Sequence, residues 1–280
     1  MILWLILAVS SLYCTHSISL SREDGSALAI YIDPPQKEAY PIVFLIPGSQ
    51  KESALRLHEM IQSDLTAGGF CLVTLEKRGG ESDPENSTLT ERLADHVLFY
   101  ENLKTTVSQW NGKIGIIGQG DGGRIGAHLG TKIKGLQAIV LISSGGAWTP
   151  LDETLYSLRS SLVNSSYTPQ YIHGFLVQAK REFAQALESP KSELKAFGYS
   201  HKYWHSYLQM DMKKDLAQLN CPVYSIHGEL DDWIPIESVH ALAHFLSDHF
   251  VLIRKEKKGR EVSQDPKTYK EATSHLAENF

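Results

Sequence analysis

Short apolar runs and amphipathic stretches alternate along most of this 280-residue chain. Several of the apolar runs are continuous rather than alternating, which is typical of strands buried on both faces of a parallel sheet. The stretches between them have the periodicity of helices. This order predicts a doubly wound, mostly parallel α/β sheet. The predicted strands are residues 27–32, 42–46, 70–75, 114–117, 136–142, 223–226 and 250–253, and the predicted helices are residues 53–67, 89–110, 123–132, 236–246 and 268–279.

The alternation stops between residues 147 and 215. This region is rich in Tyr, Ser, Lys and Glu, and it contains candidate helices at residues 151–163, 169–188 and 192–212. We predict a helical lid insertion that covers the carboxyl edge of the sheet. The core then comes in two parts, residues 20–146 and residues 216–280.

The N-terminus carries an apolar run, ILWLILAV at residues 2–9. It is too short for a membrane span of about 20 residues, but it fits the apolar region of a secretory signal. Thr15, Ser17 and Ser19 are small residues that allow cleavage, although the usual basic leader is missing. We predict a signal peptide or N-terminal anchor over residues 1–19 and a secreted or periplasmic protein. A first core strand and a cytoplasmic location are the alternatives, and the mature chain is expected to have no transmembrane helix.

Charge and cysteine content exclude several functions. The net charge is −5 and no basic stripe is visible, so a nucleic-acid partner is not expected. Three cysteines are too few for a disulfide framework. They show neither CxxC nor His-paired spacing, so we predict no metal site.

Four segments resemble, in order, those of the α/β-hydrolase family. They are YPIVFLIPGSQKES from Tyr40, CLVTLEKRGGESD from Cys71, GKIGIIGQGDGGRIGAHLG from Gly112 and CPVYSIHGELDDWIP from Cys221. The match is closest to the serine-aminopeptidase-like and esterase branch and covers about residues 39–271. It implies the α/β-hydrolase fold, acyl-transfer chemistry and no cofactor. The family's strand order also puts about three strands between Cys71 and Cys221, so both thiols are expected to be free.

The third segment resembles the family's G-x-S-x-G nucleophile elbow, with Gly118 and Gly122 on the family glycines. The nucleophile position then falls on Gly120, which has no side chain to attack a substrate. Glycine adopts the positive φ of this turn at little cost, so the turn can persist without its chemistry. Shifting the register by one residue makes Asp121 a carboxylate nucleophile, but this spoils the glycine spacing.

The other two positions of the catalytic triad lie in the C-terminal part. Asp231 falls on the position of the family's acid. The position of the catalytic His, after Gly259, holds Arg260, whose guanidinium cannot serve as a general base. Arg260 either forms an ion pair with Asp231 or is a solvated side chain.

The resemblance also implies an oxyanion hole. One backbone N–H would come from Ser49 or Gln50 and the second from Asp121. A pocket with two donors and no nucleophile is suited to a carboxylate or carbonyl group.

Two of the three triad positions therefore depart from the family pattern, in separate segments. Loss of the Ser or His leaves only about 10³–10⁴-fold acceleration over water. We predict a catalytically impaired pseudo-hydrolase that binds a small acyl, carboxylate or peptide ligand. The alternative is an active hydrolase of esters, thioesters or amides with a rearranged site.

A dinucleotide-binding site is a less favoured hypothesis. Gly118, Gly120 and Gly123 match G-x-G-x-x-G, but the next strand ends in Ser143-Ser144 without the acidic residue that binds a ribose.

Overall fold

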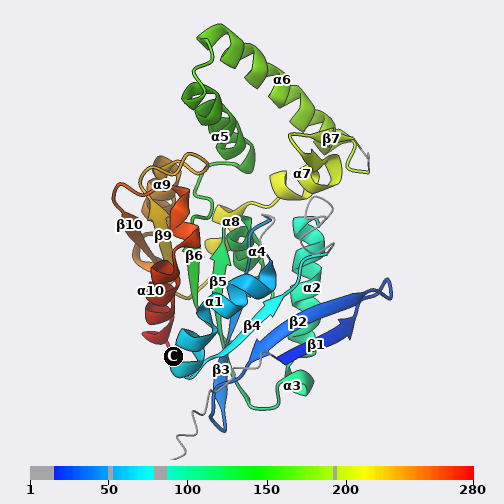
Figure 1. Ribbon diagram of the computed structural model, residues 1–280, viewed down its shortest axis with the longest axis vertical. Coiled ribbons are helices and arrows are strands. Elements are labelled where there is room, and N and C mark those ends of the chain that lie inside the picture. The colour runs from blue at the N-terminus through cyan, green and yellow to red at the C-terminus, as the bar shows by residue number, and fades with distance from the viewer. Residues whose placement is uncertain (1–15, 50–52, 79–86, 192–193) are drawn as a thin grey trace, which may run out of the picture.

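A computed structural model describes residues 16–49, 53–78, 87–191 and 194–280 (Figure 1). Its centre is an eight-stranded sheet in the order β1-β2-β4-β3-β5-β6-β9-β10. The strands of this sheet are β1 (His16–Ser21), β2 (Ala27–Asp33), β3 (Tyr40–Ile46), β4 (Cys71–Leu75), β5 (Trp110–Gln119), β6 (Leu136–Ile142), β9 (Val223–Gly228) and β10 (Phe250–Lys255). The helices of the core are α1 (Ala54–Ala67), α2 (Leu89–Glu101), α3 (Leu103–Thr106), α4 (Asp121–Gly130), α9 (Ile236–Leu246) and α10 (Pro266–Ala277), with short 3₁₀ helices η2 (Ser247–His249) and η3 (Arg260–Gln264).

The pairing of the strands confirms the predicted sheet. The six strands from β4 to β10 in the sheet order pair in parallel. Strands β1 and β2 are antiparallel to each other, and β2 is antiparallel to β4. Because the six strands are parallel, their carboxyl ends meet at one edge, which is where an open α/β sheet binds its ligands.

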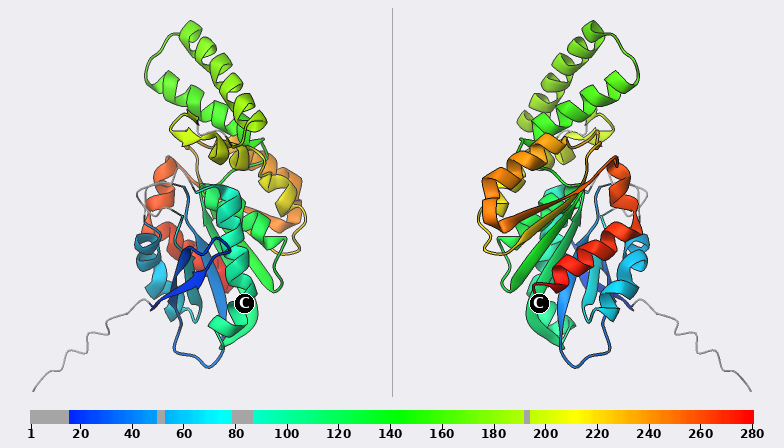
Figure 2. Two further views of the ribbon diagram at one scale, coloured as in Figure 1. Left: turned by 90° about the vertical axis from the view of Figure 1, so that its right-hand side faces the viewer. Right: turned by 90° about the vertical axis from the view of Figure 1, so that its left-hand side faces the viewer.

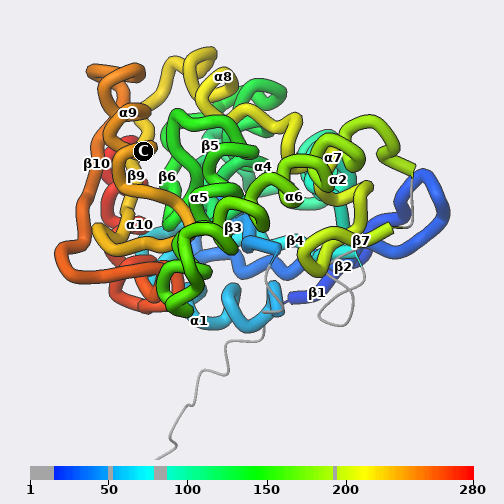
Figure 3. The backbone as a smooth tube through the Cα atoms, turned by 90° about the horizontal axis from the view of Figure 1, so that it is seen from above, coloured from blue at the N-terminus to red at the C-terminus, as the bar shows by residue number. Residues whose placement is uncertain are grey.

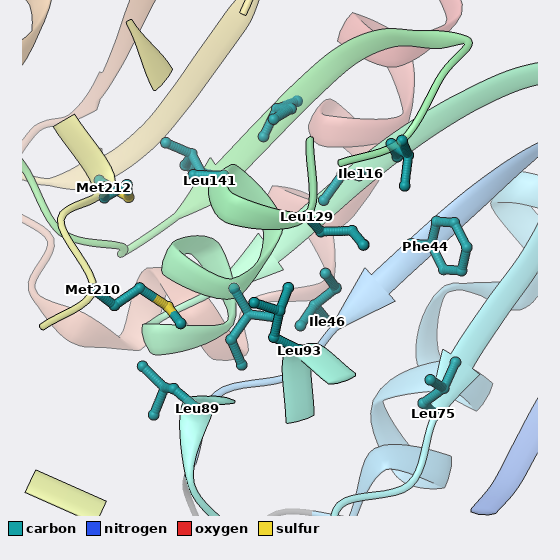
Figure 4. Close-up of a cluster of buried hydrophobic side chains, with 14 of the residues drawn as sticks. Phe44, Ile46, Leu75, Leu89, Leu93, Ile116, Leu129, Leu141, Met210 and Met212 are labelled. Carbon is teal, nitrogen blue, oxygen red and sulfur yellow. The ribbon is translucent and has the colours of Figure 1, made fainter. Parts of the chain in front are cut away.

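Helices cover both faces of the sheet, so the central strands are buried on both sides (Figure 2). On one face, α2, α4 and α9 contribute Leu93, Leu129 and Val239 to the larger apolar cluster, part of which Figure 4 shows around Phe44. On the other face, α1 and α10 contribute to the second cluster. This double burial explains why the strands are continuous apolar runs.

The region between β6 and β9, where the sequence predicted an insertion over residues 147–215, is mainly helical. It contains α5 (Pro150–Asn164), α6 (Pro169–Glu188), the two-stranded hairpin β7 (Lys195–Ala196) and β8 (Tyr199–Ser200), α7 (His201–Leu208) and α8 (Met212–Leu216). In Figures 1 and 2, α5, α6 and α7 project beyond one end of the sheet. Seen from that end, they lie in front of the strands (Figure 3). The helix predicted at residues 192–212 is wrong in its first half, where the β7–β8 hairpin occurs.

Two other predictions differ from the structure. The helix predicted at residues 89–110 ends in α3, and Trp110 is already the first residue of β5. Residues 16–19, within the predicted N-terminal segment, belong to β1, which pairs with β2 along its whole length. Residues 1–15 lie outside the described residues, so the signal peptide stays a prediction.

Two further observations concern the described part of the chain. Within it, no helix is both long and apolar enough to cross a membrane. Cys71 and Cys221 are buried and free, as predicted, with β3, β5 and β6 between their strands. Burial raises the pKa of Cys71 to about 12, so this thiol stays protonated.

Candidate functional site

A sharp turn joins β5 to α4 at the carboxyl edge of the sheet. Gly120 lies between the two elements with φ 54° and ψ −127°. The turn packs so closely that a Cβ on Gly118 would lie 2.5 Å from the Cα of Gly123, and a Cβ on Gly122 would lie 2.1 Å from the carbonyl oxygen of Ile46. A strand–turn–helix with these glycines is the geometry that the sequence predicted for this segment.

A pocket of about 290 Å³ lies between this turn and the helical insertion. Five of the six candidate residues line it, namely Ser49, Gly120, Asp121, Asp231 and Arg260. The sixth, Gln50, lies outside the described residues. Residues that are up to 211 positions apart in the chain (260 − 49) therefore meet in one cavity.

The carboxylate of Asp121 accepts a hydrogen bond from Ser49, whose backbone N–H was expected to belong to the oxyanion hole. The backbone N–H of Ser49 donates to Asp121 Oδ1 at 2.6 Å, and the Ser49 hydroxyl donates to Oδ2. In this structure the Ser49 N–H thus already has an anionic acceptor from its own chain. A substrate carbonyl could use this donor only after the Asp121 side chain moved away.

Two further side chains hold Asp121 in this position. Tyr203 on α7 donates its hydroxyl to Oδ2 at 3.1 Å. Burial raises the pKa of Tyr203 well above its usual value, so the hydroxyl remains a donor. The guanidinium of Arg92 on α2 lies 3.7 Å from Oδ2 and donates to the Ser49 hydroxyl at 3.0 Å. Neither residue was a candidate, because no local motif marks a side chain that reaches the site from a distant helix.

Asp231 lies in the turn after β9 and is 4% exposed. Its Oδ1 accepts the backbone N–H of Trp233 at 2.9 Å and that of Ile234 at 3.1 Å. These bonds fix the carboxylate at the end of the strand, where the sequence placed the acid.

Arg260 begins η3, and its Cζ lies over the indole of Trp233, 3.2 Å from the ring centroid. Burial lowers the pKa of Arg260, and attraction to Asp231 and Asp121 opposes the shift. A guanidinium remains charged at neutral pH, so this position holds a permanent cation beside the two carboxylates.

About half of the residues that line the pocket come from the insertion. Glu153 of α5 forms a buried ion pair with Arg124 of α4, and the Arg124 Cζ lies 5.1 Å from the ring centroid of Tyr207. Helix α5 also contributes Thr154, Ser157, Leu158 and Ser161 to the lining. The other lining residues of the insertion are aromatic, and they are Phe197, Tyr199, Tyr203, Trp204 and Tyr207. Sequence reasoning missed these residues individually, although the Tyr-rich composition of the region was visible.

Comparison with solved structures identifies the architecture. The 2,6-dihydroxy-pseudo-oxynicotine hydrolase matches with a TM-score of 0.66 and 17% identity over 95% of this chain and 68% of that chain. Est1E from Butyrivibrio proteoclasticus matches with a TM-score of 0.65 and 18% identity over 93% of this chain and 96% of that chain. A thermostable carboxyl esterase from Bacillus coagulans matches with a TM-score of 0.65 and 14% identity over 94% of this chain and 96% of that chain.

This chain has the α/β-hydrolase fold. No family model and no curated protein matches it. The fold can carry many reactions, so the chemistry must be argued from the site. In an α/β-hydrolase fold the strand-to-helix turn that corresponds to the one after β5 presents the nucleophile. Here that turn presents Gly120.

One further pocket residue has an unusual backbone. Ser143 follows β6, has φ 45° and is 6% exposed. It differs from the elbow position, because it follows the neighbouring strand. Among the described residues, no group of three His, Cys, Asp or Glu side chains is placed to hold a metal ion.

Proposed function

We propose that this α/β-hydrolase-fold protein is a pseudo-hydrolase, which binds a small ligand in its pocket and has lost serine-hydrolase catalysis. The observation that carries the proposal is the apex of the turn. Gly120 has the backbone of a nucleophile position and no atom that could form an acyl intermediate. A Cβ at this position would meet only the Cα of Gly48, at 3.9 Å, so crowding does not explain the glycine.

Two more features support the loss of catalysis. The Ser49 N–H is bound to the Asp121 carboxylate, which would repel a developing oxyanion. Arg260 stands where a general base is needed, and a guanidinium cannot accept a proton at neutral pH. The nucleophile position, the base position and one of the expected oxyanion-hole N–H groups thus differ from those of an active enzyme, while the pocket itself remains.

A small acyl, carboxylate or peptide ligand is the class that the sequence suggested. The solved structures compared above are of esterases and a hydrolase, and those activities belong to proteins that are at most 18% identical to this chain. They support the presence of a ligand pocket, because the fold places its binding site at this edge.

One observation favours the alternative, an active hydrolase with a rearranged site. Ser143 lines the same pocket with a positive φ, and the neighbouring strand carries His227. Burial lowers the pKa of His227, so its imidazole is neutral and could accept a proton. In that mechanism the Ser143 Oγ attacks the acyl carbon and its proton passes to His227, which returns it to the departing alcohol or amine. A water molecule that His227 deprotonates then cleaves the acyl–Ser143 ester and releases the acid.

Activity-based labelling separates the two functions. We expect no labelling by a fluorophosphonate probe and no turnover of p-nitrophenyl acetate or butyrate above the buffer rate, with an active serine esterase as positive control. Labelling of the wild type would contradict the pseudo-hydrolase. If Ser143→Ala abolished that labelling, the rearranged site would be established instead.

A further inference from the structure

Three buried polar atoms near the pocket lack hydrogen-bond partners within the described part of the chain. They are Ser143 Oγ, Asp231 Oδ2 and His227 Nδ1. Ser143, Asp231 and His227 are 6%, 4% and 0% exposed. A buried polar atom without a partner costs about 1–3 kcal/mol, and most such atoms in folded proteins are satisfied. Three of them together indicate that something polar binds there.

Backbone hydrogen bonds link the three residues. The backbone N–H of Ser143 donates to the carbonyl of Ile226 at 3.1 Å, so Ser143 lies next to His227 on the adjacent strand. His227 Nε2 donates to the carbonyl of Ile234 at 3.0 Å, while Asp231 Oδ1 accepts the N–H of the same Ile234. Ser143 and Asp231 are among the residues that line the pocket, and His227 is not.

The chemistry of these atoms specifies the group that would fit. A carboxylate oxygen only accepts hydrogen bonds. His227 uses Nε2 as its donor, so Nδ1 is also an acceptor. Ser143 can donate one bond and accept others. Asp231 Oδ2 and His227 Nδ1 therefore require a donor, and of these two residues Asp231 lines the pocket. The Ser49 N–H expected to bind a carbonyl is already taken by Asp121.

Each carboxylate of the pocket faces a guanidinium of the chain. Asp121, Glu153 and Asp231 line the pocket. Arg92 lies 3.7 Å from Asp121, Arg124 pairs with Glu153, and Arg260 is attracted to Asp231. A buried ammonium is also close, since Lys77 Nζ donates to the carbonyl of the pocket residue Gly48 at 3.5 Å. A ligand carboxylate would face Asp231 without a proton to donate, and a ligand ammonium would lie beside Arg260. An uncharged donor avoids both contacts.

We propose that the pocket binds an uncharged ligand through an alcohol hydroxyl, which donates to Asp231 Oδ2 and accepts from Ser143 Oγ. The aromatic side chains of Phe197, Tyr199 and Trp204 on the insertion contact the apolar part of the ligand. This inference rests on the proposed function, because it assumes a ligand that is held and not cleaved. It replaces the carboxylate of the sequence-based hypothesis with an alcohol.

A matched series of probes tests the head group. Isothermal titration calorimetry of the full chain would compare 4-phenylbutanol, 4-phenylbutylamine, 4-phenylbutyrate and butylbenzene, which share one apolar skeleton. We expect the alcohol to bind about tenfold or more tightly than the other three, since a hydrogen bond to a charged group is the main difference. Tighter binding of the acid or of the amine would overturn the hydroxyl assignment but keep the ligand-binding function. Absence of binding by all four would overturn both proposals.

Variants locate the contact. Asp231→Asn weakens the binding of 4-phenylbutanol about tenfold, and Ser143→Ala weakens it several-fold. Asp232→Asn is the control, because Asp232 is the exposed neighbour in the same turn and loses the same charge. Circular dichroism checks that each variant folds. Equal affinities for the wild type and both site variants would overturn the assignment and would indicate that the three atoms bind only water.

Discussion

Gly120 occupies a backbone conformation that costs a residue with a side chain about 1–3 kcal/mol. In an active enzyme this strain presents a nucleophile, and glycine at φ 54° relieves it. The sequence predicted this turn because Gly118, Gly120 and Gly122 lie within five residues of one another. It did not predict that Asp121 binds Ser49, because these residues are 72 positions apart and only the folded sheet brings them together.

His96 allows a residue-scale prediction about pH. Burial lowers the pKa of His96 to about 4, while its Nδ1 donates to the carbonyl of Arg92 at 2.7 Å. The unfolded chain takes up a proton at about pH 6.5, and the folded chain does so only near pH 4. The contribution of His96 to the free energy of unfolding should therefore be constant above about pH 6.5 and fall as the pH drops from there toward 4, by up to about 1.4 kcal/mol per pH unit.

Urea unfolding of the wild type and of His96→Gln between about pH 7 and pH 5 measures this effect. The variant should lose less stability with acid than the wild type. His249→Gln serves as control, because His249 is exposed and should leave the slope unchanged. An identical slope in wild type and His96→Gln would show that this imidazole is not the group that titrates.

At the scale of elements, the bounds of helices and strands were predicted well only where capping residues or a clear apolar period mark them. Helix α6 was predicted with its observed bounds, because Thr168 caps its first turn and Pro169 begins it. The boundary between α3 and β5 was missed, because the helical spacing of apolar residues continues to Trp110. This spacing alone does not mark the end of the helix before that residue. The β7–β8 hairpin was missed because two-residue strands are too short to show a period.

The ion pair between α4 and α5 joins the insertion to the core and carries the second prediction. Arg124 and Glu153 are 1% and 0% exposed, and Glu153 also accepts the Gly146 N–H at 2.6 Å and the Ser238 hydroxyl at 2.8 Å. Removing one charge leaves the other buried without its partner. Glu153→Gln or Arg124→Met alone should lower the free energy of unfolding by about 3–5 kcal/mol.

Denaturant unfolding of both single variants and of the double variant gives the coupling energy. The double variant should cost clearly less than the sum of the single variants, since it leaves no unpaired charge. Asp152→Asn, one residue away on the exposed side of α5, should change stability by less than about 1 kcal/mol. Additive single effects would mean that the two side chains do not stabilise each other.

At the scale of the whole molecule, the site is assembled from segments that are distant in the chain. Ser49 follows β3, Asp121 begins α4, Asp231 follows β9 and Arg260 begins η3. Parallel pairing brings these positions to one edge of the sheet, which is why the family resemblance was enough to predict that they share a site. The aromatic wall comes from the insertion, whose packing against the core could not be derived from composition.

Under the proposed pseudo-hydrolase function, this assembly predicts which substitutions would introduce catalysis. Gly120→Ser with Arg260→His supplies a nucleophile and a base, but Asp121 would still hold the Ser49 N–H. We expect the double variant to stay near the buffer rate with p-nitrophenyl butyrate. Adding Asp121→Ala frees the Ser49 N–H and should raise turnover about 100-fold over the double variant, because one hydrogen-bond donor of an oxyanion hole contributes about 10²–10³ in rate.

Asp121→Ala alone should stay inactive, since it lacks a nucleophile at the apex of the turn. Equal rates for the double and triple variants, both folded by near-ultraviolet circular dichroism, would show that the Asp121 carboxylate does not block the oxyanion hole.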